Sequence, residues 1–462
     1  MKDTSSIPLP EIKKVHVRHK TMSWNDMFSC MNAQSNKHSF ACLLSGTQLD
    51  CATHVFFGVN PFLIVQVKNS NITLKTTACT ETIEWDIFQF LNHLFASYQP
   101  LDLNTAGAIG YFAYECGHYI EKLPHCKDNE NIDDIIICFY SIFYSYHIKE
   151  NHLTRYDFET NVLPFQNNSS NIHEKQTIVS SIQQQIHRDD YIQNLHKVID
   201  YIRDGDIYQA NISQKFTIWG DFDGFGIFKR LFKINPAPFF AYLNVADVEI
   251  ISSSPERFIL CDDHRIETRP IKGTVSRGKT QSQDNAYRQW LLSSRKDEAE
   301  LAMIVDLLRN DIGKISCPGS VHVGEFKRVE PYNNVYHLIS IVGAMMESSI
   351  QPMDVIKAVF PGGSITGCPK IRAMEIISEI EQETRGVYTG SIFFHSFGHY
   401  FDSNIAIRTL VIKGNQMTFR VGGGIVYDSI PENEYNETIY KGQSILQSLG
   451  VNYEQYLKQA RA

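Results

Sequence analysis

Short runs of β-branched and aromatic residues fill much of the first third of the chain, and they constrain its fold more than any other feature. Residues 55–59 and 62–67 form two such runs between glycine, asparagine and proline residues, and 133–147 forms a third. Runs of this length, bounded by turn-forming residues, predict antiparallel strands. Residues 87–95 instead carry apolar side chains at helical spacing. We therefore expect residues 1–165 to form a sheet-rich region with one or two helices.

The second region, residues 186–462, follows a polar stretch at 159–185 and mixes both patterns. Apolar residues recur at helical spacing between 192 and 202. Strand patterns recur at 239–243, 248–258, 403–412 and 417–426. Together the two regions indicate an α+β protein that is long enough to bury a large core.

Composition excludes several classes of function. The chain has 462 residues and a net charge of −8, which gives no indication of nucleic-acid binding. Its ten cysteines are scattered without a C-x-x-C pair, a pattern typical of reduced thiols rather than a zinc site or a disulfide framework. The amino terminus is polar, and no apolar run reaches about 18 residues. We expect a cytoplasmic protein without a membrane segment.

A candidate nucleophile stands in residues 269–274, Arg-Pro-Ile-Lys-Gly-Thr, which place Lys272 on a predicted turn after a strand-like run at 265–268. A free lysine has a pKa near 10.4, so on the order of one amine in a thousand is neutral at pH 7. Burial or neighbouring cations lower that pKa, and Arg269 and Arg277 are near enough in sequence to contribute. The alternative is a surface lysine in a proline-glycine turn.

Four glutamates stand where an acid or a metal ligand could act. Glu256 lies in a proline turn before the strand that leads to Lys272, so the two could share a pocket. Glu300 falls on the apolar stripe of a predicted helix, where a carboxylate is costly unless it is paired or metal-bound. Glu434 and Glu437 lie one turn apart at the start of the last predicted helix. Such carboxylates are the hard oxygen ligands that Mg²⁺ prefers, with solvated charge as the alternative.

Three segments are suited to anionic groups. Residues 360–370 form a glycine-rich loop before a helix, where backbone amides either bind a carboxylate or pack tightly. Cys368 and Pro369 stand where a phosphate loop requires Lys and Ser or Thr, which excludes a nucleoside triphosphate site. Arg408, in an apolar strand pattern, needs an anionic partner. The glycines at 422–424 let a ligand approach a strand backbone or mark a bulge.

In order and content these motifs resemble those of the chorismate-utilising enzymes, and within that family the aminodeoxychorismate synthases. The resemblance rests on residues 253–258, 270–274, 308–313, 361–370, Arg408 and 422–424, and covers about 186–450. It implies an α+β fold of two large antiparallel β-sheets packed as a sandwich with surrounding helices, and a chorismate-binding catalytic region at 186–462. Lys272 is the discriminating position, because the corresponding turn of anthranilate synthase component I resembles P-I-A-G-T.

The resemblance also implies a reaction. The amine of Lys272 attacks C2 of chorismate while the C4 hydroxyl leaves, with Glu256 as general acid. Ammonia then adds at C4 and expels Lys272, which gives 4-amino-4-deoxychorismate for para-aminobenzoate and folate biosynthesis. The implied cofactor is Mg²⁺, held by Glu300 and Glu437 with Glu434 as a further contributor. Substrate contacts are implied for Arg408, Lys441, His337, Thr274, Gly422, Gly423, Gly424 and Thr366.

A tryptophan pocket is a further expectation from the resemblance. Residues 43–46, in the 1–165 region, and 235–239 look like the segments that line such a pocket in this family. The candidate pocket residues are Ser45, Asn235, Pro236 and Phe239.

The chain carries no glutaminase signature, so we expect a separate glutamine amidotransferase partner to supply ammonia. Two alternatives remain among enzymes, anthranilate synthase component I and isochorismate synthase. An alternative of another class is a non-catalytic protein that binds an aromatic ligand such as tryptophan. The joint presence of Lys272, Glu256, Glu300 and Glu437 argues against that alternative.

Overall fold

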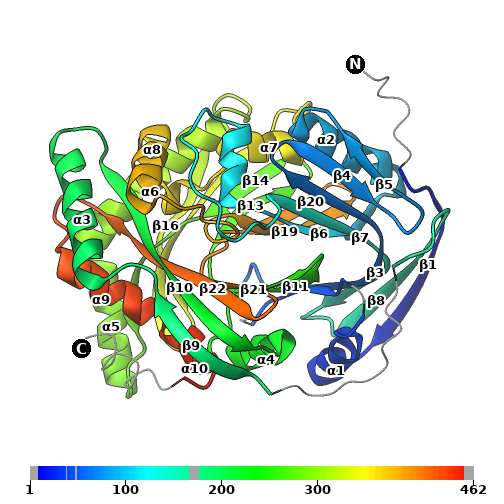
Figure 1. The fold of residues 1–462 in the computed structure, drawn as a ribbon, viewed down its shortest axis with the longest axis horizontal. Helices are drawn as coiled ribbons and strands as arrows, with labels where there is room; N and C mark the ends of the chain where they lie inside the picture. Colours follow the sequence, from blue (N-terminus) through cyan, green and yellow to red (C-terminus); the bar gives the residue numbers. More distant parts are fainter. Residues whose placement is uncertain (1–8, 38, 47–48, 166–175, 452–462) are drawn as a thin grey trace.

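The structure is a computed structural model that describes residues 9–37, 39–46, 49–165 and 176–451 (Figure 1). All pairings between its named strands are antiparallel. They form two large sheets with helices on the outside, so the predicted α+β sandwich is confirmed. None of the helices in the described ranges is both long and apolar enough to cross a membrane.

Two long neighbouring strands, β3 (His54–Lys68) and β7 (Ile135–His147), connect the sheets because each contributes to both. The first part of β3 pairs with β2 (Ala41–Leu44), and its last part pairs with β4 (Asn71–Lys75). A register shift between Pro61 and Leu63 separates the two parts. The sandwich is therefore one continuous hydrogen-bonded ladder folded into two layers.

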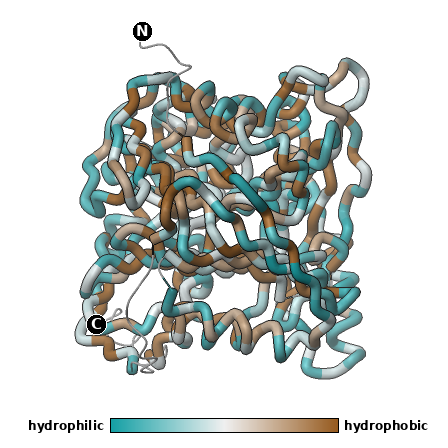
Figure 2. The backbone as a smooth tube through the Cα atoms, turned by 90° about the vertical axis from the view of Figure 1, so that its right-hand side faces the viewer, coloured by the Kyte–Doolittle hydropathy of each residue, from teal (hydrophilic) through white to brown (hydrophobic). Residues whose placement is uncertain are grey.

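The first sheet runs in the order β9, β10, β22, β21, β12, β11, β2, β3, β7, β8, β1. The other strands in this order are β1 (Ile12–Thr21), β8 (His152–Thr160), β9 (Ile178–Gln184), β10 (Gln209–Asp221), β11 (Phe239–Val245), β12 (Val248–Ser254), β21 (Thr409–Lys413) and β22 (Gln416–Ile425). The short strand β18 (Gly367–Cys368) pairs with the start of β10. Figure 2, seen from the side of β1 and β8, shows hydrophilic residues along this edge. A polar edge strand disfavours pairing with another chain.

The second sheet runs in the order β5, β4, β3, β7, β6, β19, β20, β13, β14, β17, β16, and β15 continues beside β17 after β14. Its remaining strands are β5 (Thr80–Ile83), β6 (Leu103–Phe112), β13 (Arg257–Asp262), β14 (Arg265–Arg269), β15 (Ile271–Ser276), β16 (His322–Pro331), β17 (Val335–Met345), β19 (Ser391–Phe397) and β20 (Tyr400–Asn404). Because β6 pairs with β19 and β2 with β11, strands from 1–165 and 186–462 share both sheets.

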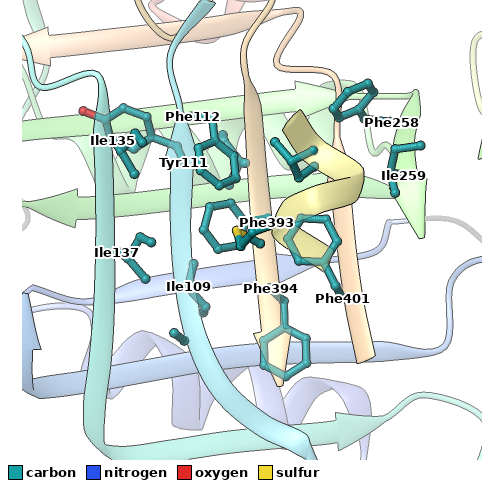
Figure 3. Packing of buried hydrophobic residues seen from close by; sticks show 14 of the residues in the cluster. Ile109, Tyr111, Phe112, Ile135, Ile137, Phe258, Ile259, Phe393, Phe394 and Phe401 are labelled. Carbon is teal, nitrogen blue, oxygen red and sulfur yellow. The ribbon is translucent and has the colours of Figure 1, made fainter. Parts of the chain in front are cut away.

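Helices cover the outer faces of the two layers. The described helices are α1 (Trp24–Gln34), α2 (Ile87–Tyr98), α3 (Arg188–Arg203), α4 (Gly224–Ile234), α5 (Gln281–Ser293), α6 (Arg295–Gly313), α7 (Pro352–Val359), α8 (Lys370–Glu381), α9 (Pro431–Lys441) and α10 (Gln443–Ser448). One apolar core joins α2, α6 and α7 to the second sheet, and the other joins α1, α3, α4, α9 and α10 to the first. Aromatic rings interlock in the first of these cores, where Phe112 and Phe393 stack with centroids 4.6 Å apart (Figure 3).

Two local predictions are wrong. Lys272 lies in a strand rather than a turn, because β17 pairs with β14 before Pro270 and with β15 after it, so the chain stays extended. Arg408 does not lie within one strand at 403–412. It stands between β20 and β21 with a φ of +51°, a left-handed conformation that ends the strand pattern.

Candidate active site

Lys272 lies at a β-bulge. Two residues of β15, Lys272 and Gly273, oppose a single residue of β17, Leu338. A bulge of this kind changes the direction of a side chain and is common beside active sites. Gly273 has a φ of +77°, which favours glycine. The motif at residues 269–274 therefore forms a β-bulge, which places Lys272 outside the regular strand pairing.

The amine of Lys272 is largely buried, with 13% of the side chain exposed. Burial is the main cause that lowers its pKa, and the charge of Lys441 lowers it further. Glu300 opposes the shift from 3.9 Å away, measured from Lys272 Nζ to Glu300 Oε2. Arg269 and Arg277, the expected cations, are bound to other carboxylates. The cation that helps to lower the pKa of Lys272 is thus Lys441, rather than either of the two arginines.

Glu256 lies between β12 and β13, and only 5% of the residue is exposed. Its Oε1 accepts a hydrogen bond of 2.7 Å from Ser364 Oγ. Burial raises the pKa of the Glu256 carboxyl to about 7, although Ser364 and the charge of Lys272 both lower it. A carboxyl with a pKa near neutral can give and take a proton at pH 7. The structure therefore places an acid-base group and an amine of lowered pKa in one pocket.

Two helices bring carboxylates to the same pocket. Glu300 projects from α6 toward Lys272. Glu437, on α9, forms an ion pair of 2.8 Å with Lys441, and the charge of Lys272 also lowers its pKa. Both carboxylates thus face the positive groups of the site rather than bulk solvent alone.

The positions of these carboxylates test whether the site fits the expected Mg²⁺ ion. Glu434 accepts a hydrogen bond of 2.8 Å from Ser429 Oγ, and burial raises its pKa, with a further contribution from Glu437. The described part of the chain has no cluster of three or more His, Cys, Asp or Glu side chains placed to hold a metal ion. Mg²⁺, however, usually binds through one or two carboxylates and takes water and substrate as its other ligands. Glu300 and Glu437 fit that smaller requirement.

Arg408 and His337 form an unsatisfied polar surface in the site. Burial lowers the pKa of the Arg408 guanidinium, and the groups that oppose this are the tyrosines Tyr332 and Tyr440. No carboxylate of the described residues forms an ion pair with it. His337 Nδ1 is 2.8 Å from Thr274 Oγ1, while its buried Nε2 has no hydrogen-bond partner among the described residues. A half-buried cation without a carboxylate partner and an imidazole nitrogen without a hydrogen bond can both be satisfied by an anionic ligand.

The glycine strand β22 forms one wall of the site. Lys441 Nζ donates a hydrogen bond of 2.9 Å to the carbonyl oxygen of Gly422. A Cβ at Gly424 would lie 3.1 Å from Lys272 Nζ, so glycine leaves room for that amine. A Cβ at Gly423 would meet Glu434 Oε2 at 3.5 Å, an ordinary contact. A side chain at 424 would therefore press on the ends of Lys272 and Gln209, which glycine leaves undisturbed.

Gln209, on β10, was missed by the sequence analysis. It is fully buried, and neither polar atom of its side-chain amide has a hydrogen-bond partner in the described part of the chain. Its Nε2 lies as close to the Cβ position of Gly424 as Lys272 Nζ does, at 3.1 Å. The only signal in the sequence was a polar residue in a buried strand, which is too common to identify a site.

Thr366 uses its hydroxyl inside the glycine-rich loop. The residue is fully buried, and its Oγ1 donates a hydrogen bond of 2.9 Å to the carbonyl oxygen of Gly362. A role in substrate binding would therefore involve other atoms of this residue, so that expectation stays a prediction.

A separate cavity lies between the two regions of the chain. Ser45 and Phe239 line it, together with Cys51 and Asp402, whereas Asn235 and Pro236 do not. Asp402 also binds Arg257, the residue after Glu256, through two hydrogen bonds of 3.0 and 2.8 Å. One ion pair thus links the lining of this cavity to the residue that follows Glu256.

A buried amine of lowered pKa, a near-neutral carboxyl group and an unpaired arginine define an enzyme site for a small anion. Residues 40–447 match the family described as chorismate binding enzyme, and the chain belongs to this family. It is 39% identical over 351 residues to aminodeoxychorismate synthase component 1 of Escherichia coli strain K12, covering 74% of this chain and 77% of the relative.

Two further comparisons agree with this family. Identity to aminodeoxychorismate synthase component 1 of Bacillus subtilis strain 168 is 36% over 381 residues, covering 79% of this chain and 80% of the relative. The fold is similar to the crystal structure of anthranilate synthase component I from Streptococcus pneumoniae TIGR4, with a TM-score of 0.73 and 28% identity. That match covers 86% of this chain and 93% of the other.

Proposed function

We propose that this chain aminates chorismate at C4 to give 4-amino-4-deoxychorismate, a step of para-aminobenzoate and folate biosynthesis. Relatives named aminodeoxychorismate synthase component 1 support the proposal. The observation that carries it is the amine of Lys272, buried on a bulge beside Glu256 with a lowered pKa. We further propose that residues 186–462 supply the reacting groups.

The first step uses Lys272 and Glu256. The neutral amine forms a bond to C2 as the ring double bonds shift and the C4–O bond breaks. Glu256 gives its proton to the leaving hydroxyl, which departs as water, and the resulting carboxylate takes the extra proton from the Lys272 nitrogen. Hydroxide is a poor leaving group, and a positioned general acid contributes about 10² to 10⁴ in rate.

The second step releases the enzyme. Ammonia forms a bond to C4, the double bonds shift back, and the bond between C2 and Lys272 breaks. Glu256 returns a proton to the departing lysine nitrogen and takes one from the new ammonium group. The pKa of about 7 suits a group that changes its protonation state in both steps.

The same proposal assigns the binding groups. Arg408, Lys441 and His337 hold the two carboxylates and the ring of the substrate, because they supply cationic and hydrogen-bonding groups that lack a complete set of partners. Glu300 and Glu437, with Glu434 nearby, would hold Mg²⁺. When bound, the ion supplies positive charge beside a substrate carboxylate.

A partner and a regulatory ligand complete the proposal. The relatives are named component 1, which supports a second component, and we assign it as a glutamine amidotransferase that supplies ammonia. We assign the cavity beside Ser45 and Phe239 to tryptophan. All ten cysteines are unpaired, which supports a reducing, cytoplasmic setting.

A product assay tests this function. The purified chain is incubated with chorismate, ammonium chloride and MgCl₂, and the products are separated and weighed by mass spectrometry. We expect a product in which an amino group replaces the C4 hydroxyl of chorismate. Fluorescent anthranilate would instead support the anthranilate synthase alternative, and binding without turnover would support the non-catalytic one. Robust turnover with glutamine by this chain alone would remove the need for a partner.

A further inference from the structure

The loop that carries Ser364 is fitted tightly between two elements of the site. Ser364 lies in a short 3₁₀ turn, η4 (Gly363–Ile365), between α7 and α8. A Cβ at Gly362 would lie 2.6 Å from Ile405 Cδ1, and one at Gly363 would lie 2.5 Å from Leu307 Cδ2 on α6. Only glycine at both positions lets the loop enter this space without displacing its neighbours.

Hydrogen bonds fix the loop from its other side. Thr366 Oγ1 donates to the Gly362 carbonyl at 2.9 Å, and Arg385 Nη1 donates to the Ile365 carbonyl at 3.1 Å. Arg385 is itself held by an ion pair of 2.7 Å with Glu381, and both side chains are almost fully buried. The position of Ser364 is therefore set by packing and by a buried ionic group rather than by its own side chain.

From this fixed position Ser364 contacts one oxygen of Glu256. Its hydroxyl donates a hydrogen bond of 2.7 Å to Glu256 Oε1, with 8% of Ser364 and 5% of Glu256 exposed. A serine hydroxyl has a single hydrogen, and here Oε1 receives it. While the hydroxyl donates to Oε1, the acidic proton of Glu256 is favoured on Oε2, and a backbone hydrogen bond from Ile271 also stabilises the carboxylate.

We propose that Ser364 is a positioning residue that holds the proton of Glu256 on Oε2 and sets the strength of that acid. The proposal rests on the proposed function, in which Glu256 protonates the leaving hydroxyl. Ser364 does not touch the substrate in this proposal. It stabilises the ionised carboxylate and so offsets part of the effect of burial.

Removal of the hydroxyl has an effect of known sign. In Ser364→Ala the carboxylate loses a charge-assisted hydrogen bond, so the pKa of Glu256 rises, by about one unit. The rate of adduct formation requires a neutral Lys272 and a protonated Glu256, so it rises and then falls with pH. We expect the apparent pKa near 7 in this profile, which Glu256 sets, to rise by about one unit.

The experiment follows formation of the chorismate adduct in single turnovers between pH 6 and 10, with quenched samples read by intact-protein mass spectrometry. The other apparent pKa, set by Lys272, serves as an internal control that should not move. Ser364→Thr keeps a hydroxyl and should restore the apparent pKa of Glu256, and Ser364→Cys, a weaker donor, should lie between. Ser448→Ala is the matched control, because Ser448 is also buried and donates a 2.7 Å hydrogen bond to the Ile445 carbonyl within α10.

Each outcome decides the proposal. An unchanged apparent pKa of Glu256 in folded Ser364→Ala, while Glu256→Gln is inactive, would overturn the role of Ser364 and leave the proposed function intact. Adduct formation at the wild-type rate in Glu256→Gln would overturn both. Should Ser364→Ala fail to fold, the order of the apparent Glu256 pKa values in the threonine and cysteine variants gives the same decision.

Discussion

Lys272 Nζ lies 3.9 Å from Glu300 Oε2, although the two residues belong to β15 and α6 and the whole of α5 separates them in the chain. That separation allows a strong electrostatic interaction but exceeds the length of a hydrogen bond. Lys272 is therefore not held as an ammonium by a close partner, and burial can keep its pKa low. Because Lys272 does not hydrogen-bond to Glu300, the carboxylate oxygens of Glu300 stay available to other ligands.

Replacement of Lys272 should abolish the covalent intermediate. We expect wild-type protein incubated with chorismate to gain the mass of chorismate less one water, and Lys272→Ala to gain none. Intact-protein mass spectrometry measures both. Lys279→Ala serves as a matched control, because Lys279 lies in the exposed segment after β15. The same mass gain in Lys272→Ala would assign the nucleophile to another residue.

The lowered pKa of Lys272 also affects stability. Its pKa in the folded state is below the unfolded value of about 10.4, so at neutral pH folding favours loss of the proton from this amine. The lowered pKa therefore reduces the free energy of unfolding, and this reduction disappears as the pH rises toward about 10.4. At pH 7 the free energy of unfolding of Lys272→Met should therefore be about 1 kcal/mol higher than that of wild type. We expect the difference to shrink by pH 9.5 in urea titrations. A difference that grows with pH would mean that the amine is stabilised as an ammonium.

Arg408 should contribute to substrate affinity rather than to folding. Arg408→Gln removes a half-buried cation that has no carboxylate partner in the part of the chain that the structure describes, so we expect kcat/KM for chorismate to fall about 30-fold while the free energy of unfolding is unchanged or higher. Arg265→Gln is the control, because 71% of the Arg265 side chain is exposed. A large loss of stability with an unchanged KM would make Arg408 a structural residue.

Metal removal tests the carboxylates on α6 and α9. We expect excess EDTA to abolish turnover and MgCl₂ to restore it, and Glu300→Gln to raise the half-saturating Mg²⁺ concentration about tenfold. Glu298→Gln changes a carboxylate on the same helix that pairs with Lys327 instead, so it should titrate like wild type. Full turnover in excess EDTA would remove the metal from the proposal.

Glu267 should hold the two catalytic strands together. Its Oε1 accepts hydrogen bonds from Arg257 Nη1 at 2.7 Å and from Arg269 Nε at 2.6 Å, and these arginines lie one residue from Glu256 and three from Lys272. Glu267→Ala leaves two largely buried guanidinium groups without their shared partner, so we expect a loss of about 3 kcal/mol in unfolding free energy. Glu150→Ala, at a 71% exposed side chain, should cost almost nothing.

By itself the sequence determined the strand-rich first region, the helices of α2, α3 and α6, and which residue types carry the chemistry, because hydrophobic periodicity and short motifs are local properties of a chain. Only the tertiary structure decided how those residues act. The bulge at Lys272 depends on its register with β17, and the bond from Ser364 to Glu256 joins residues 108 positions apart. Gln209 enters the site only because β10 lies beside β22, and Arg408 lacks an ion pair because no carboxylate of residues 9–37, 39–46, 49–165 or 176–451 folds against it. The pKa values and distances of a site depend on burial and long-range packing, which the order of residues does not state.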